Sequence, residues 1–191
     1  YFLYFEYYLT MELTKNLSQA KLFKSLVVIV LGSIALTISA KIKIPFYPVP
    51  MTMQTFVVML IGILFGWKLG LFTVLLYLME GIVGLPVFAG TPEKGMGIVY
   101  FTGPTMGYLL GFLITVYLTG FFKFDNNFLK NFVKLCFAVS FIYSFGLLWL
   151  GSLIGWDKPI FELGAQPFLL AELFKVLILT ILIPKILRFR I

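Results

Sequence analysis

The sequence predicts an all-α membrane protein built as a bundle of six transmembrane helices. Of its 191 residues, 61% are hydrophobic and only 12% are charged, whereas about a quarter of the residues in soluble domains are charged. At roughly 20 residues per span plus a connector, this length accommodates about six helices. The apolar runs also lack the alternation of polar and apolar residues that a membrane β-barrel requires.

The first half of the chain is expected to contain three spans, at 22–40, 52–65 and 69–83. Residues 1–21 lack the order of charged, apolar and small residues of a cleavable signal, so the first apolar run is expected to remain as a span. Residues 1–21 are expected to be a cytoplasmic extension of the membrane domain 22–191. Because Met11 follows residues 1–10, these ten residues are a candidate for sequence upstream of the natural start. Prolines between 45 and 50 interrupt the helix, because each lacks an N–H group. A tight turn is predicted at Gly66-Trp67-Lys68.

Three further spans are expected at 103–121, 135–153 and 167–187. Pro104 falls at the second position of the fourth span, where the missing donor costs nothing. The loops before the fourth and sixth spans are long. Loops of this length are usually functional or disordered, and their apolar, aromatic content favours a folded cap.

Charge predicts the orientation. Of the 15 lysine and arginine residues, ten lie on one side of the spans, four on the other, and Lys175 lies within the last span. The positive-inside rule then places both termini in the cytoplasm. It also explains the net charge of +7 by topology, and no nucleic-acid partner is expected. Histidine is absent and Cys136 is the single cysteine, so no metal or cofactor is expected and no enzymatic machinery is visible.

Glu172 and Lys175 are the most informative polar residues. They are three positions apart and therefore lie on one face of the last span. A charged residue at a helix centre costs about 2.5 to 3.5 kcal/mol on insertion scales, so neither should face lipid. The pair is either a structural ion pair or a binding site for a neutral polar group such as a urea.

Other polar and small residues allow two interpretations each. Glu80 either reaches the outer interface or belongs to a site, and Gln54 either donates to a ligand or caps the second helix. Glycines at four-residue spacing are expected to permit close helix packing. Small residues of the first span form ridges suited to a partner subunit or to the bundle itself. They are Ser33, Ala35, Thr37 and Ser39.

Three motifs occur together, at 48–55 (PVPMTMQT), 84–90 (GLPVFAG) and 103–112 (GPTMGYLLGF). In order and spacing they closely resemble the BioY family, over about residues 22–187. That family is the biotin-specific substrate-binding subunit, or S component, of energy-coupling-factor (ECF) importers. The resemblance implies a six-helix bundle with a biotin pocket under its outer loops, a transmembrane scaffold subunit and two cytoplasmic ATPases as partners, and a place in the inner membrane of a prokaryote.

The resemblance also implies site residues. The family's Asp-x-x-Lys falls on Glu172 and Lys175, where the acid is one methylene longer. The implied substrate-binding residues are Glu172, Lys175, Gln54, Phe88, Gly90, Tyr108 and Glu93, with Thr91 as an alternative to Glu93. The ridges of the first span would contact the scaffold. Two other hypotheses stay open, namely an S component for thiamine, riboflavin or another vitamin, and a structural or assembly membrane protein without a ligand.

Overall fold

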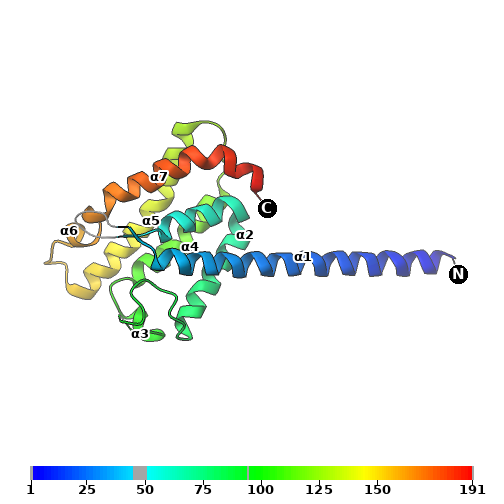
Figure 1. The fold of residues 1–191 in the computed structure, drawn as a ribbon, viewed down its shortest axis with the longest axis horizontal. Coiled ribbons are helices and arrows are strands. Elements are labelled where there is room, and N and C mark those ends of the chain that lie inside the picture. Colours follow the sequence, from blue (N-terminus) through cyan, green and yellow to red (C-terminus); the bar gives the residue numbers. More distant parts are fainter. Residues whose placement is uncertain (1, 45–50, 94, 191) are drawn as a thin grey trace.

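The computed structural model describes residues 2–44, 51–93 and 95–190, and most of them are helical. Figure 1 shows one bundle from which a single long helix projects. The elements are α1 (Phe2–Lys41), β1 (Lys43–Ile44), β2 (Met51–Thr52), α2 (Gln54–Ile82), α3 (Ile98–Phe101), α4 (Met106–Phe121), α5 (Phe128–Ile154), α6 (Ile160–Gly164), α7 (Gln166–Ile186) and the 3-10 helix η1 (Leu187–Phe189).

Four helices in the described part of the chain are long and apolar enough to cross a membrane. The qualifying segments lie at Gln19–Lys41, Gln54–Ile82, Phe128–Ile154 and Gln166–Phe189. The 16-residue α4 is apolar but shorter. These helices support the predicted all-α membrane protein.

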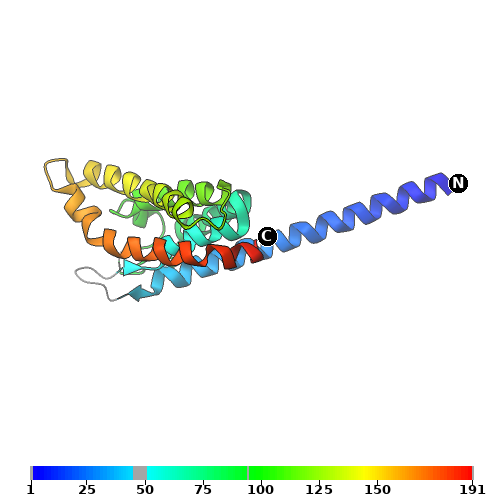
Figure 2. The same cartoon turned by 90° about the horizontal axis from the view of Figure 1, so that it is seen from above.

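Helix α1 is longer than the predicted first span. It starts at Phe2 rather than near residue 22, because neither proline nor glycine occurs before Gly32. Its N-terminal half extends away from the bundle in both views (Figures 1 and 2). At its other end, the short antiparallel pair β1 and β2 leads to α2. The prolines predicted to break the chain here lie at 45–50, outside the described residues.

The predicted turn between the second and third spans falls within α2. Gly66 has a φ of 72° and a ψ of 174°, so the backbone is not helical at this residue. A positive φ costs glycine little because it lacks a Cβ atom. The chain therefore changes direction at Gly66 and α2 consists of two helical runs, which are close to the predicted 52–65 and 69–83.

The starts of two later helices differ from the sequence prediction. Helix α4 starts at Met106 instead of residue 103, so Pro104 lies in the turn that precedes it. Helix α5 starts at Phe128 instead of residue 135, because Asn127 accepts a hydrogen bond from the backbone N–H of Lys130 and caps the helix. The short helices α3 and α6 were not predicted.

Close helix packing depends on the spaced glycines. A Cβ atom at Gly62 would lie 2.0 Å from Thr119 Oγ1, and one at Gly111 would lie 2.5 Å from the Cα atom of Ile142. Neither position has room for a side chain. The predicted packing role is confirmed for Gly62 and Gly111, which bring α4 against α2 on one side and α5 on the other. Gly66, in contrast, lies at the break in α2, where a Cβ atom would have no close neighbour among the described residues.

Candidate functional site

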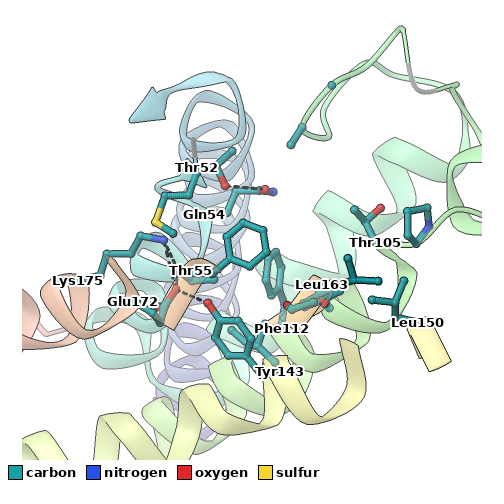
Figure 3. Close-up of a pocket in the computed structure, with 18 of the residues that line it drawn as sticks. Thr52, Gln54, Thr55, Thr105, Phe112, Tyr143, Leu150, Leu163, Glu172 and Lys175 are labelled. Atoms are coloured by element: carbon teal, nitrogen blue, oxygen red, sulfur yellow. Dashed lines mark hydrogen bonds and ion pairs between the residues drawn. The ribbon is translucent and has the colours of Figure 1, made fainter. Parts of the chain in front are cut away.

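A cavity of about 620 Å³ opens among the starts of α2, α4 and α7 and the end of α5. These helix ends lie on the side of the bundle away from the N-terminal half of α1 (Figure 1). The walls of the cavity come from the β1–β2 pair, the start of α2, the segment before α3, and helices α4 to α7. Figure 3 shows how these elements surround it. The lining residues are Lys43, Met51, Thr52, Gln54, Thr55, Ala89, Gly90, Pro104, Thr105, Tyr108, Phe112, Ile142, Tyr143, Leu150, Ile154, Leu163, Gly164, Phe168, Glu172 and Lys175.

Glu172 and Lys175 meet at the wall of this cavity. Glu172 Oε2 lies 3.3 Å from Lys175 Nζ, and the two residues are 4% and 5% exposed. Thr55 on α2 joins them, since it accepts from Lys175 Nζ at 3.0 Å and donates to Glu172 Oε2 at 2.9 Å. The ion pair thus connects α7 to the start of α2.

A third donor reaches the same carboxylate oxygen. Tyr143 on α5 donates to Glu172 Oε2 at 3.1 Å, and Figure 3 shows both side chains at the cavity. The other oxygen, Oε1, is buried and has no hydrogen-bond partner among the described residues. A buried polar atom without a partner is costly. Glu172, which lines the cavity, therefore keeps one carboxylate oxygen that the described residues do not bond.

The rest of the wall is mostly apolar. Phe112 on α4 and Ile142 on α5 line the cavity, together with Leu163 on α6 and Phe168 on α7. Tyr108 fixes α6 against α4, since its hydroxyl donates to the carbonyl of Gly164 at 2.8 Å. The cavity can therefore hold a ligand with one polar head and a larger apolar body.

Five predicted substrate-binding residues line the cavity. They are Glu172, Lys175, Gln54, Gly90 and Tyr108. Gln54 does not cap α2, whose N-cap is Met53, without a side-chain cap bond. Its amide instead donates to Tyr77 Oη at 2.7 Å.

Phe88 and Glu93 do not line the cavity. Phe88 is 1% exposed and packs against Tyr77 and Tyr100, so it supports the wall from behind. Glu93 lies exposed on the loop before α3. The alternative, Thr91, is buried and accepts a hydrogen bond from Lys41.

The small residues of α1 divide between the bundle and the surface. Ser33 is fully buried and donates to a carboxylate oxygen of Glu80 on α2. Ser39 is also buried and donates to Leu36 O within α1. Ala35 is exposed and Thr37 is half-buried. Ser33 and Ser39 therefore face the chain's own bundle in this conformation, and Glu80 is bonded within the protein.

The sequence prediction missed several lining residues. Thr105 lies three positions before Tyr108, and Phe112 lies four positions after it. This spacing could have placed all three residues on one helix face. Tyr143 carried a weaker signal, as a hydroxyl within an apolar span. Phe168 carried none, because apolar residues of a membrane helix face lipid and cavity alike, and Leu163 lies in the segment that the sequence assigns to a loop.

The comparisons with known proteins agree with each other. The BioY family model matches residues 11–190. The probable biotin transporter BioY of Pyrococcus horikoshii is 36% identical over 74% of this chain and 83% of its own. That of Rickettsia prowazekii is 34% identical over 82% and 80%. A crystal structure of the S-component for biotin from an ECF-type ABC transporter superposes with a TM-score of 0.72, at 25% identity, over 88% of this chain and 93% of that one.

Proposed function

Because this chain belongs to the BioY family, we propose that it captures biotin in the cavity described above as the S component of an ECF importer. The chain is a membrane protein that serves biotin uptake, and it is a transport subunit rather than an enzyme. The observation that carries the proposal for the site is the buried pair of Glu172 and Lys175 in the wall of a cavity with a mostly apolar lining, with one carboxylate oxygen of Glu172 left without a partner in the described part of the protein.

Biotin matches the chemistry of this site. Its ureido ring carries N–H donors on both sides of a carbonyl, and we assign the carboxylate of Glu172 as the acceptor for one of them. Lys175, Thr55 and Tyr143 already bond the other oxygen. They hold the carboxylate in place before the ligand arrives, which lowers the cost of binding. Lys175 also supplies a donor for the ureido oxygen or the carboxylate.

The apolar wall suits the remainder of the ligand. Phe112, Ile142 and Phe168 offer contacts to the thiophane ring and the valerate chain. The volume of about 620 Å³ lies within the range of small-molecule sites, roughly 300 to 1,000 Å³. Tyr108, Gln54 and Gly90 also line the cavity. Phe88 does not line it and supports the wall by packing behind it.

A different vitamin is less compatible with the same residues. A cation such as thiamine favours an uncompensated acid, whereas Lys175 neutralises Glu172 at 3.3 Å. Burying a cation beside this pair leaves an excess positive charge in a medium of low dielectric. The neutral ureido ring of biotin introduces no such charge.

The proposal includes six spans, with α2 counted as two, and cytoplasmic termini in the inner membrane of a prokaryote. Transport then requires a transmembrane scaffold subunit and two cytoplasmic ATPases. The exposed side of α1, which includes Ile34, Ala35 and Ile38, is the surface that we assign to the scaffold. Ser33 and Ser39 contribute indirectly, by packing α1 on the bundle.

Biotin binding to the purified chain in detergent tests the function. Isothermal titration should detect tight binding of biotin, and competition by thiamine and riboflavin should fail. The double variant Glu172→Ala, Lys175→Ala should lose binding. Its control is Asp157→Ala, Lys158→Ala, which removes an exposed ion pair with an N–O distance of 3.1 Å. Wild-type affinity in the first double variant would remove the site assignment.

A further inference from the structure

The segment 87–91 supplies Ala89 and Gly90 to the cavity wall, and side chains of other elements bond its backbone carbonyls. Tyr77 on α2 donates to Val87 O at 3.1 Å. Tyr100 on α3 donates to Ala89 O at 2.9 Å, and burial raises the pKa of this phenol, so the hydroxyl keeps its proton. An irregular segment is thereby held in one conformation from two sides.

The strongest attachment of this segment comes from α1. Lys41 Nζ lies 2.9 Å from Phe88 O, 2.9 Å from Thr91 O and 2.8 Å from Thr91 Oγ1. An ammonium group has three N–H donors, and three acceptors of the segment surround this one. Hydrogen bonds from a charged donor are about twice as strong as neutral ones. Lys41 therefore ties the last residue of α1 to the cavity wall.

Lys41 acts on the wall rather than on the ligand. It does not line the cavity, in contrast to Lys43 two residues later. Its three donors already have acceptors within the protein. Without Lys41, Phe88 O keeps the hydroxyl of Thr91 as a donor at 2.7 Å, but no other donor among the described residues reaches Thr91 O. The end of the segment next to Gly90 would lose its tie to α1.

We propose that Lys41 is a positioning residue, which holds segment 87–91 in place as a preformed wall and so determines how long biotin stays bound. The effect on biotin rests on the proposed function, whereas the effect on the segment does not. Preorganisation lowers the cost of ordering on binding. Its loss should appear mainly in the dissociation rate, because related complexes differ mostly in that rate.

Three variants of the full chain in detergent test the effect on the ligand. Lys41→Met keeps the apolar stem and removes all donors, Lys41→Arg keeps the charge and donors, and Lys24→Met removes an exposed lysine from the same helix. We expect Lys41→Met to bind biotin about tenfold more weakly, with a faster dissociation rate. Lys41→Arg should recover most of the affinity, and Lys24→Met should match the wild type. Equal dissociation rates in Lys41→Met and the wild type would overturn the effect on biotin.

Hydrogen–deuterium exchange without ligand tests the effect on the segment. Amides of 87–93 should exchange faster in Lys41→Met than in Lys24→Met, while amides of α4 and α5 should be unchanged. If the wild type fails to bind biotin but this exchange difference appears, the proposed function fails and the positioning role stands. Equal exchange in the two variants would overturn the positioning role.

Discussion

Tyr143 on α5 and Glu172 on α7 meet at the cavity wall through a hydrogen bond of 3.1 Å. The bond joins two helices through residues that are 29 positions apart in sequence. It occupies the same carboxylate oxygen as Thr55 and Lys175. The carboxylate is thus fixed from three helical elements, with its second oxygen unoccupied by the protein.

Replacing Tyr143 with phenylalanine tests this arrangement. The ring remains, but Glu172 loses one donor, at a cost of about 1.5 to 3 kcal/mol for a hydrogen bond to a charged group. We expect weaker biotin binding, measured by titration calorimetry. Tyr117→Phe is the control, because Tyr117 lies partly exposed against Phe121. Equal biotin affinity of Tyr143→Phe and the control would show that the hydroxyl does not orient the acid.

Replacing Lys175 with methionine leaves Glu172 buried without its counterion. Removing one partner of a buried pair costs about 3 to 5 kcal/mol. The thermal unfolding temperature should drop, and biotin binding should be lost. Lys158→Met is the control, since its pair with Asp157 is exposed and such pairs contribute about 0 to 1 kcal/mol.

The double variant Glu172→Gln, Lys175→Met separates stability from binding. Removing both charges eliminates the buried, uncompensated acid, so much of the lost thermal stability should return. Biotin binding should not return, because the charged acceptor for the ureido N–H is gone. Recovery of both properties would contradict the role of Glu172 as the acceptor.

Gly111→Val tests the close contact of α4 with α5. The new side chain would meet the backbone of Ile142, which lies 2.5 Å from a Cβ atom at this position. Overpacking of this kind costs about 1 to 3 kcal/mol, so the unfolding temperature should fall. Leu110→Ala, at a partly exposed neighbour on the same helix, should change the unfolding temperature less. The opposite order would contradict the packing.

Ser33→Ala removes the hydrogen bond from α1 to Glu80. Interhelical hydrogen bonds in membranes contribute about 0.6 kcal/mol on average, and up to about 1.7. We expect a small loss of thermal stability with unchanged biotin affinity, because neither residue lines the cavity. A large loss of biotin affinity at full stability would place this bond in the binding mechanism.

Much of the fold could be predicted because composition and local pattern carry it. Apolar runs that are long enough to cross a bilayer predict membrane helices. The glycine at position 66 predicts a break between two of them, where the backbone adopts a positive φ. Helix starts were less predictable. Asn127 begins α5 seven residues early by capping it, and this short-range effect operates within a polar stretch that hydropathy assigns to a loop.

The site was only partly predictable for a different reason. The sequence by itself determined the membrane class, the family motifs and the pairing of Glu172 with Lys175, because three-residue spacing on a helix places both on one face. Only the tertiary structure decided that Thr55 and Tyr143 complete that pair, that Phe88 lies behind the wall, and that Ser33 turns inward. These contacts join residues from separate helices. The spacing of residues within one helix does not specify which neighbouring helix each of its faces will contact.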